Sequence, residues 1–164
     1  GTLNKDGEFI RGKSIGKSAL ITSFYNSDAN DGKGAWAKDA KIDPNDLSGR
    51  VFLEKDIKKE NPSLLVYAVN ARNGKYYDFK VTGGRERKNY DSSDGYYRGM
   101  PIGKNADGQY IYASARDIGN IGAGYVAAAN GIPYSLARKA FDIYQGGKEG
   151  ISTQNAEHYG CKQM

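Results

Sequence analysis

Residues 115–129 read Ala115-Arg116-Asp117-Ile118-Gly119-Asn120-Ile121-Gly122-Ala123-Gly124-Tyr125-Val126-Ala127-Ala128-Ala129. A charged pair and an asparagine lead directly into a run of glycine and alanine, where a solvent-facing helix carries lysine and glutamate. Small side chains allow another backbone or a ligand to approach closely. We therefore expect this segment to pack tightly and to hold its three polar residues against a crowded surface.

Two helices are expected in this half of the chain. The first runs from about Ile118 to Asn130 and ends at Gly131, with Asp117 as its N-cap. The second begins at Pro133 and ends at Gly146, and its apolar side chains recur on one face. The short link between them predicts a helical hairpin.

The remaining sequence is rich in turns. Residues 1–60 form an expected loop-rich entry region, with clear breaks at 26–32 and 43–46. Asn61 as a cap and Pro62 at the first helical position predict another helix. Its expected apolar face consists of Leu64, Leu65, Ala68 and Val69. Alternation over residues 75–81 predicts a strand, and residues 83–108 predict a long polar loop.

These elements predict an α+β fold in a single compact domain over residues 1–164, with its core in residues 61–164. The N-terminal half is expected to be irregular with short strands, and the C-terminal half to be a helical hairpin. No run approaches 18 apolar residues, so we expect no membrane span.

The net charge and the composition limit the kinds of ligand and metal site that we expect. A formal net charge of +5 favours anionic polymers such as RNA, DNA or an anionic cell wall. One cysteine and one histidine are too few for a disulfide framework or a classical zinc centre. Gly16-Lys17-Ser18 lacks the upstream glycine of a phosphate loop, and residues 26–31 lack the glycine of a calcium loop. The sequence therefore predicts no cofactor and no metal site.

Two groups of side chains near these elements are candidates for chemistry. Arg116, Asp117 and Asn120 form the first, because Asp117 and Asn120 lie about one turn apart on a helix. Asp117 is equally well explained as a helix cap. Asp78 and Lys80 form the second, because they would point to one face of the expected strand. A surface ion pair explains them equally well.

The third candidate group is Glu157-His158-Tyr159. His158 is the only side chain expected to titrate near neutral pH without a perturbed pKa, so it suits general acid or base catalysis. A lone histidine is more commonly a surface or core residue without such a role.

Several of these segments resemble a known family. Arg116-Asp117-Ile118-Gly119-Asn120, the small-residue helix, the break at Asn130-Gly131 and the segment Phe141-Asp142-Ile143-Tyr144-Gln145 resemble the polymorphic toxin type 44 domain. Upstream, residues 67–80 are similar to that family's aromatic, Val, Arg, Asn-Gly and Trp-Asp-Tyr-Lys segment, with Tyr77 where tryptophan is usual. The resemblance covers roughly residues 64–80 and 110–160.

The resemblance implies the C-terminal toxin domain of a bacterial secreted protein, delivered into the cytoplasm or periplasm of rival bacteria. It also implies an immunity protein that neutralises the toxin in the producing cell. Delivery signals would lie on an upstream carrier, which would account for the lack of a signal segment at residue 1. The family's activity is generally proposed to be RNA cleavage. Some members have a histidine shortly after the shared motif, where this chain has Ile121-Gly122-Ala123.

Three functions remain open from the sequence. In a metal-independent ribonuclease, Glu157 or His158 would exchange protons and Arg116 or Lys80 would hold the phosphate. Tyr125 would stack on a base. In a peptidoglycan glycosidase, Asp78 and Asp117 would be the paired carboxylates. In a binding module, the motif would only fix the helices. The side chains expected at the substrate are Lys80, Tyr77, Tyr125 and Gln145.

Overall fold

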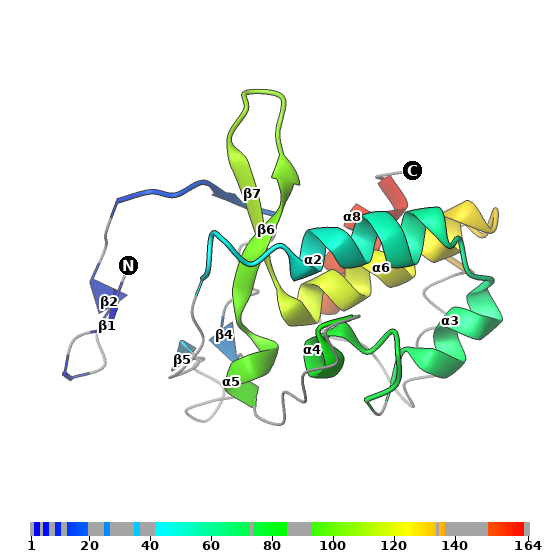
Figure 1. The fold of residues 1–164 in the computed structure, drawn as a ribbon, viewed down its shortest axis with the longest axis horizontal. Coiled ribbons are helices and arrows are strands. Elements are labelled where there is room, and N and C mark those ends of the chain that lie inside the picture. Colours follow the sequence, from blue (N-terminus) through cyan, green and yellow to red (C-terminus); the bar gives the residue numbers. More distant parts are fainter. Residues whose placement is uncertain are drawn as a thin grey trace.

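The computed structural model describes residues 2–3, 5–6, 9–10, 13–19, 25–26, 35–36, 42–72, 74–84, 93–133, 135–136 and 151–162. Its architecture is α+β, as expected: helices gather around α6 (Ala115–Ala129), and a small sheet stands at the N-terminal end of that helix (Figure 1). Among the described residues, no helix is both long enough and apolar enough to cross a membrane.

Helix α6 begins three residues earlier than expected, because Ser114 and not Asp117 is its N-cap. The Ser114 Oγ accepts a hydrogen bond from the Asp117 amide at 3.2 Å. Asp117 therefore lies in the first turn, where a negative charge interacts favourably with the positive end of the helix dipole. The end of the helix is as expected, since Asn130 caps it and Gly131 adopts a φ of 70°.

The glycine track of α6 packs against α8 (Ile151–Lys162). A Cβ on Gly124 would overlap the Glu157 carbonyl of α8, and a Cβ on Gly160 would overlap the Ile121 carbonyl of α6. The two backbones therefore touch at reciprocal glycines. Close packing of residues 115–129 is confirmed, and α8 is one partner of that surface. The expected helix from Pro133 to Gly146 lies mostly outside the described residues.

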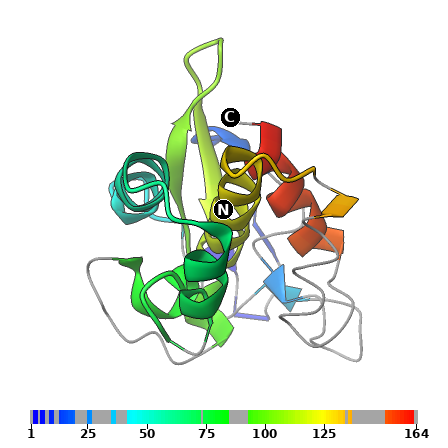
Figure 2. The ribbon, with the colours of Figure 1, turned by 90° about the vertical axis from the view of Figure 1, so that its right-hand side faces the viewer.

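The opposite side of α6 meets a helix formed by α2 (Ser48–Val51) and the π-helix η1 (Phe52–Lys59). The Glu60 amide donates to the Lys55 carbonyl five residues earlier, at 3.2 Å, which is the π-helical spacing. Gly122 makes room for this helix, because a Cβ there would lie 3.2 Å from the Phe52 ring. Figure 2 shows α6 between this helix and α8. These helical residues lie within the region expected to be loop-rich.

Helix α3 (Leu64–Asn70) differs from the expectation in its cap and its buried face. Ser63 caps it by accepting from the Val66 amide at 3.3 Å, and Asn61 lies outside with a φ of 47°. The expected face was wrong in part, because Leu65 is 63% and Val69 39% exposed. The buried residues are Tyr67 and Ala68. The large Tyr67 ring stacks on Tyr77 with centroids 5.1 Å apart and so determines which side faces the core.

The expected strand at residues 75–81 was also wrong, because this segment forms turns and the short helix α4 (Phe79–Thr82). The Asp78 carboxylate accepts from the Gly74 amide at 2.9 Å, and the Tyr77 amide donates to the Asn70 carbonyl at 2.8 Å. These bonds fold the chain back on α3. Three consecutive side chains, Tyr77, Asp78 and Phe79, are buried, so no strand-like alternation exists.

The expected loop at residues 83–108 contains a helix and a strand. Helix α5 (Ser93–Tyr96) precedes β6 (Gly99–Lys104), which pairs antiparallel with β7 (Tyr110–Ser114). β3 (Lys17–Ser18) pairs parallel with β7, giving the order β3-β7-β6. The β6–β7 hairpin projects from the helical body (Figure 1).

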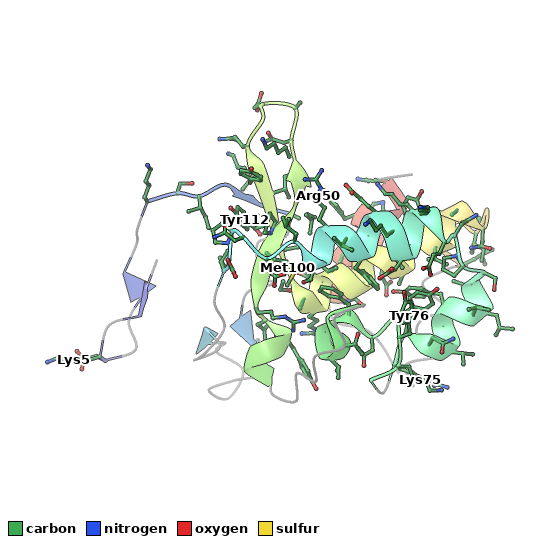
Figure 3. The ribbon with its side chains drawn as sticks, in the orientation of Figure 1. Lys5, Arg50, Lys75, Tyr76, Met100 and Tyr112 are labelled. Carbon is green, nitrogen blue, oxygen red and sulfur yellow. The ribbon has the colours of Figure 1, made fainter. Side chains whose placement is uncertain are left out.

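Further along the hairpin, the sheet joins the core. Met100 is fully buried, its sulfur accepts a hydrogen bond from the Ser48 hydroxyl at 3.4 Å, and Figure 3 shows it near the start of α2.

Two further antiparallel pairs are short: β1 (Thr2–Leu3) with β2 (Phe9–Ile10), and β4 (Tyr25–Asn26) with β5 (Ala35–Trp36).

The glycine contact yields a stability prediction. Gly124→Ala should lower the free energy of unfolding by about 2 kcal/mol, because its methyl group forces α6 and α8 apart. Gly119→Ala is the matched control in the same helix, since its Cβ would lie 4.0 Å from the Phe79 Cβ, an ordinary contact. It should be neutral or stabilise by up to about 1 kcal/mol. Urea unfolding followed by circular dichroism measures both, and equal values would contradict the packing described.

Candidate functional site

The candidate site lies where α4, α5 and the first turn of α6 meet. The tripeptide Tyr96-Tyr97-Arg98, at the end of α5 and just before β6, connects these elements. Tyr96 contacts the Lys80 ammonium group of α4, and Tyr97 contacts the Arg116 guanidinium group of α6. Arg98 contacts backbone carbonyls of α4 and α5. This tripeptide therefore determines how the cationic side chains of α4 and α6 are presented.

Arg98 joins α4 to the start of α6. Its Nη1 donates to the carbonyls of Lys80 at 2.8 Å and Gly95 at 2.7 Å, and its Nη2 donates to the Phe79 carbonyl at 3.3 Å. Its own carbonyl accepts from the Ala115 amide at 2.9 Å. A guanidinium beside helix carbonyls is favoured by both hydrogen bonding and the helix dipole. The side chain and backbone of Arg98 thus fix both helices at one point.

Two more cations lie over the rings of this tripeptide. Lys80 Nζ is 5.4 Å from the Tyr96 ring centroid. Arg116 Nη1 donates to the Tyr97 hydroxyl at 2.8 Å, and its guanidinium carbon is 5.8 Å from that ring's centroid. Both cations are only half-buried, so part of each side chain contacts solvent. Cations placed on aromatic rings in this way suit an anionic or aromatic ligand.

The candidate carboxylates, in contrast, are buried. Asp117 is 1% exposed, Asp78 7% and Glu157 0%. Asp117 is next to Arg116 in the first turn of α6. Asp78 stands immediately before α4, and Glu157 lies on the face of α8 that meets α6. In this conformation none of the three carboxylates is open to a polymeric substrate.

Asp78 and Glu157 are brought toward one buried hydroxyl, that of Tyr67. This hydroxyl donates to the Gly119 carbonyl of α6 at 2.7 Å. Burial raises the pKa of Tyr67 above its usual range, and the carboxylates of Glu157 and Asp78 raise it further. Both acids therefore lie within electrostatic range of Tyr67, beneath α6. Burial likewise raises the pKa of Tyr77, with further contributions from Glu60, Tyr76 and Asp56.

The other expected site residues are spread more widely. Asn120 is half-buried, one turn beyond Arg116 on α6. Tyr125 lies nine residues beyond Arg116, about 13 Å along the helix axis, and has Lys58 Nζ 5.4 Å from its ring centroid. His158 is exposed on α8, next to Glu157, whose backbone meets Gly124 of α6. Tyr77 is in the core, and Gln145 lies outside the described residues.

Lys80 and Asp78 are therefore not the neighbours that a strand would have made them. The Asp78 carboxylate bonds to the Gly74 amide, whereas the Lys80 ammonium lies over Tyr96. Tyr96, Tyr97 and Arg98 were missed by sequence reasoning, because they fell within the expected polar loop. Their one sequence signal is two adjacent aromatic residues followed by a base. Within the described ranges, no three His, Cys, Asp or Glu residues are grouped so that they could hold a metal ion.

Comparisons with known proteins found no similar protein. Neither the protein-family models nor the curated proteins nor the solved structures contain a match to this chain.

Arg98 gives a prediction that separates a structural cation from a surface one. Arg98→Leu should lower the free energy of unfolding by about 3 kcal/mol, because three carbonyls lose a charged donor. Arg50→Leu is the control: Arg50 is paired with Glu54 at 3.1 Å on the outer side of α2 (Figure 3), and its side chain is 52% exposed. That change should cost less than about 0.5 kcal/mol. Thermal and urea unfolding test both variants, and a small loss for Arg98→Leu would contradict its linking role.

The tyrosines predict a loss of stability in alkali. Burial raises the pKa of Tyr67, Tyr77, Tyr112 and Tyr159 in the folded chain. The unfolded chain then loses these protons first, so the free energy of unfolding should fall as the pH rises above about 10. Tyrosinate absorbance should rise in two phases, the second coinciding with unfolding. Titration of all 13 tyrosines in one step, with the fold intact, would contradict this prediction.

Proposed function

We propose that this chain is the toxin domain of a bacterial secreted protein, related to the polymorphic toxin type 44 domain, and that it hydrolyses RNA in rival cells. One observation carries the proposal: Lys80 and Arg116, both half-buried, lie on adjacent tyrosine rings where α4, α5 and α6 meet. The residues that carry the family resemblance, Arg116 to Asn120, form the first turns of the same helix. A cognate immunity protein and an upstream secretion carrier follow from the resemblance.

The proposed chemistry assigns phosphate binding to the accessible cations. RNA cleavage requires a base for the 2′-hydroxyl, an acid for the leaving oxygen and positive charge for the phosphorane. Arg116 offers a planar fork of donors that matches two phosphate oxygens, and Lys80 adds a second charge. Asn120, one turn along α6, adds a neutral donor.

Asp117 is the proposed proton acceptor, because it adjoins Arg116. It is 1% exposed, so the first turn of α6 must rearrange its side chains before this carboxylate reaches a 2′-hydroxyl. Glu157 is fully buried, and His158 is on the exposed side of α8, next to the residue that packs on Gly124, eight positions beyond Arg116. These positions favour Asp117 over both residues for this role.

A peptidoglycan glycosidase is less well supported by the same geometry. That reaction needs two carboxylates on either side of an accessible glycosidic bond. Asp78 and Asp117, the candidate pair, are 7% and 1% exposed, so both would have to become accessible. The candidates that are accessible, Lys80, Arg116 and Asn120, carry no carboxylate. A binding module without catalysis would use the same cations.

Expression in two compartments of a bacterial cell tests the proposal. The domain in the cytoplasm should arrest growth and degrade cellular RNA, and purified protein should cleave single-stranded RNA. Arg116→Gln should lower the cleavage rate by about 100-fold, since it removes a charge that stabilises the transition state. Asp117→Asn should lower it by a similar factor. Arg50→Gln, a surface substitution on α2, should leave the rate unchanged.

Three results would contradict the proposal or its assignment of Asp117. A folded Asp117→Asn variant with full toxicity would remove Asp117 from the reaction. Lysis that occurs only after export to the periplasm, with RNA intact, would favour the glycosidase. Absence of toxicity and of cleavage in both compartments would leave the binding module.

A further inference from the structure

The projecting β6–β7 hairpin carries a second group of aromatic and cationic side chains, at the end of β7 away from α6. Tyr110 is 46% exposed, and Lys104 Nζ lies 4.7 Å from its ring centroid. The two residues are directly paired across the hairpin. The hairpin stands clear of the helical body in Figures 1 and 2. The exposed part of this ring is thus available for contact with another molecule.

The tip of this hairpin is held in a fixed shape. The Asn105 side-chain oxygen accepts from the amides of Asp107 at 3.0 Å and Gln109 at 2.9 Å, and the Asn105 amide donates to the Gln109 carbonyl at 2.9 Å. Gly108 completes the turn with a φ of 74°. A rigid turn of this kind reduces the entropy that Tyr110 and Lys104 lose on binding a ligand.

The charges near Tyr110 are mainly positive. Strand β3 lies beside β7, with Lys17 paired to Ile111, the residue after Tyr110. Lys104 is exposed on the same face of the hairpin as Tyr110, whereas Lys17, opposite Ile111, is exposed on the other face. The exposed acid on the hairpin tip is Asp107. An exposed aromatic ring with a lysine beside it suits single-stranded nucleic acid, because a base stacks on the ring while the cation contacts the backbone.

We propose that the β6–β7 hairpin binds single-stranded RNA through base stacking on Tyr110 and phosphate contact by Lys104. This inference rests on the proposed function, and it specifies the substrate as single-stranded. β7 ends where α6 begins, and its five residues cover roughly 17 Å. Tyr110 and Arg116 thus lie at opposite ends of this strand, and the proposed single strand runs along it between them. Double-stranded RNA keeps its bases stacked on one another and offers no free base to the ring.

Binding of a strand that cannot be cleaved tests the hairpin without requiring catalysis. The probe is a fluorescein-labelled single strand of about 12 nucleotides, fully 2′-O-methylated, so that its sugars lack the attacking hydroxyl. Fluorescence anisotropy gives the Kd over a range of salt concentrations. Tyr110→Leu should weaken binding about tenfold or more, and Tyr110→Phe, which keeps the ring, should bind like the wild type.

Lys104→Gln should reduce the slope of log K against log salt concentration by about 0.7, the value for one lost contact to a single strand. Lys75→Gln is the matched control: Lys75 is exposed on the turn beside α3 in Figure 3, away from the hairpin, and its loss should leave the slope unchanged. Circular dichroism establishes that each variant is folded. A duplex of the same sequence should bind more weakly, with no effect of Tyr110→Leu.

The outcomes separate the hairpin from the proposed function. If the wild type binds the probe and Tyr110→Leu binds equally well, the hairpin inference is wrong and the proposed function stands. If the wild type binds isolated peptidoglycan sacculi and not the probe, both are wrong. If it cleaves RNA but Tyr110→Leu affects duplex and single strand alike, the single-strand preference is wrong.

Discussion

The absence of side chains at the glycines of α6, on the two sides where other helices pack, is the constraint on which this structure depends. Gly124 and Gly160 let α6 and α8 meet backbone to backbone, and Gly122 admits the Phe52 ring from the other side. Because both neighbours approach so closely, α6 is enclosed on two sides and its N-terminal turn is held in place. A larger residue at Gly122 or Gly124 would act on the candidate site indirectly, by moving the helix that carries Arg116.

Hydrogen bonds of polar side chains also hold the start of α6 in place. Arg98 connects α4 to the start of α6 with three hydrogen bonds and bonds to Gly95 of α5 with a fourth, and Ser114 caps α6 close by. The accessible cations, Lys80 and Arg116, lie on the rings of the two residues that precede Arg98. The same short segment, residues 96–98, therefore both stabilises the fold and presents the accessible cations, whereas the candidate acids are buried. This arrangement distinguishes the part of the site that meets a ligand from the part that supports it.

The sequence predicted those features that follow from local chemistry. The close packing of residues 115–129 and the helix end at Gly131 were confirmed. Glycine within a helix commonly marks close packing, and glycine just after a helix commonly ends it with a positive φ. The strand at 75–81 was wrong, since the Asp78 carboxylate and long-range backbone bonds to α3 override a local alternation. The expected face of α3 was wrong in part, because Tyr67 stacks on Tyr77 in the core while Leu65 and Val69 are exposed. Arg98 acts through residues 18 positions away, which no local pattern could indicate.

The glycine contact also has a consequence for the order in which the chain becomes folded. A ribosome releases α6 before α8, so the strip around Gly124 stays uncovered until residues 151–162 have emerged. Ala156 and Glu157, both fully buried in the finished protein, arrive with that last helix. Until then α6 lacks the helix that packs on Gly124 in the finished protein. The contact between the two backbones is therefore completed only after α8 has been synthesised.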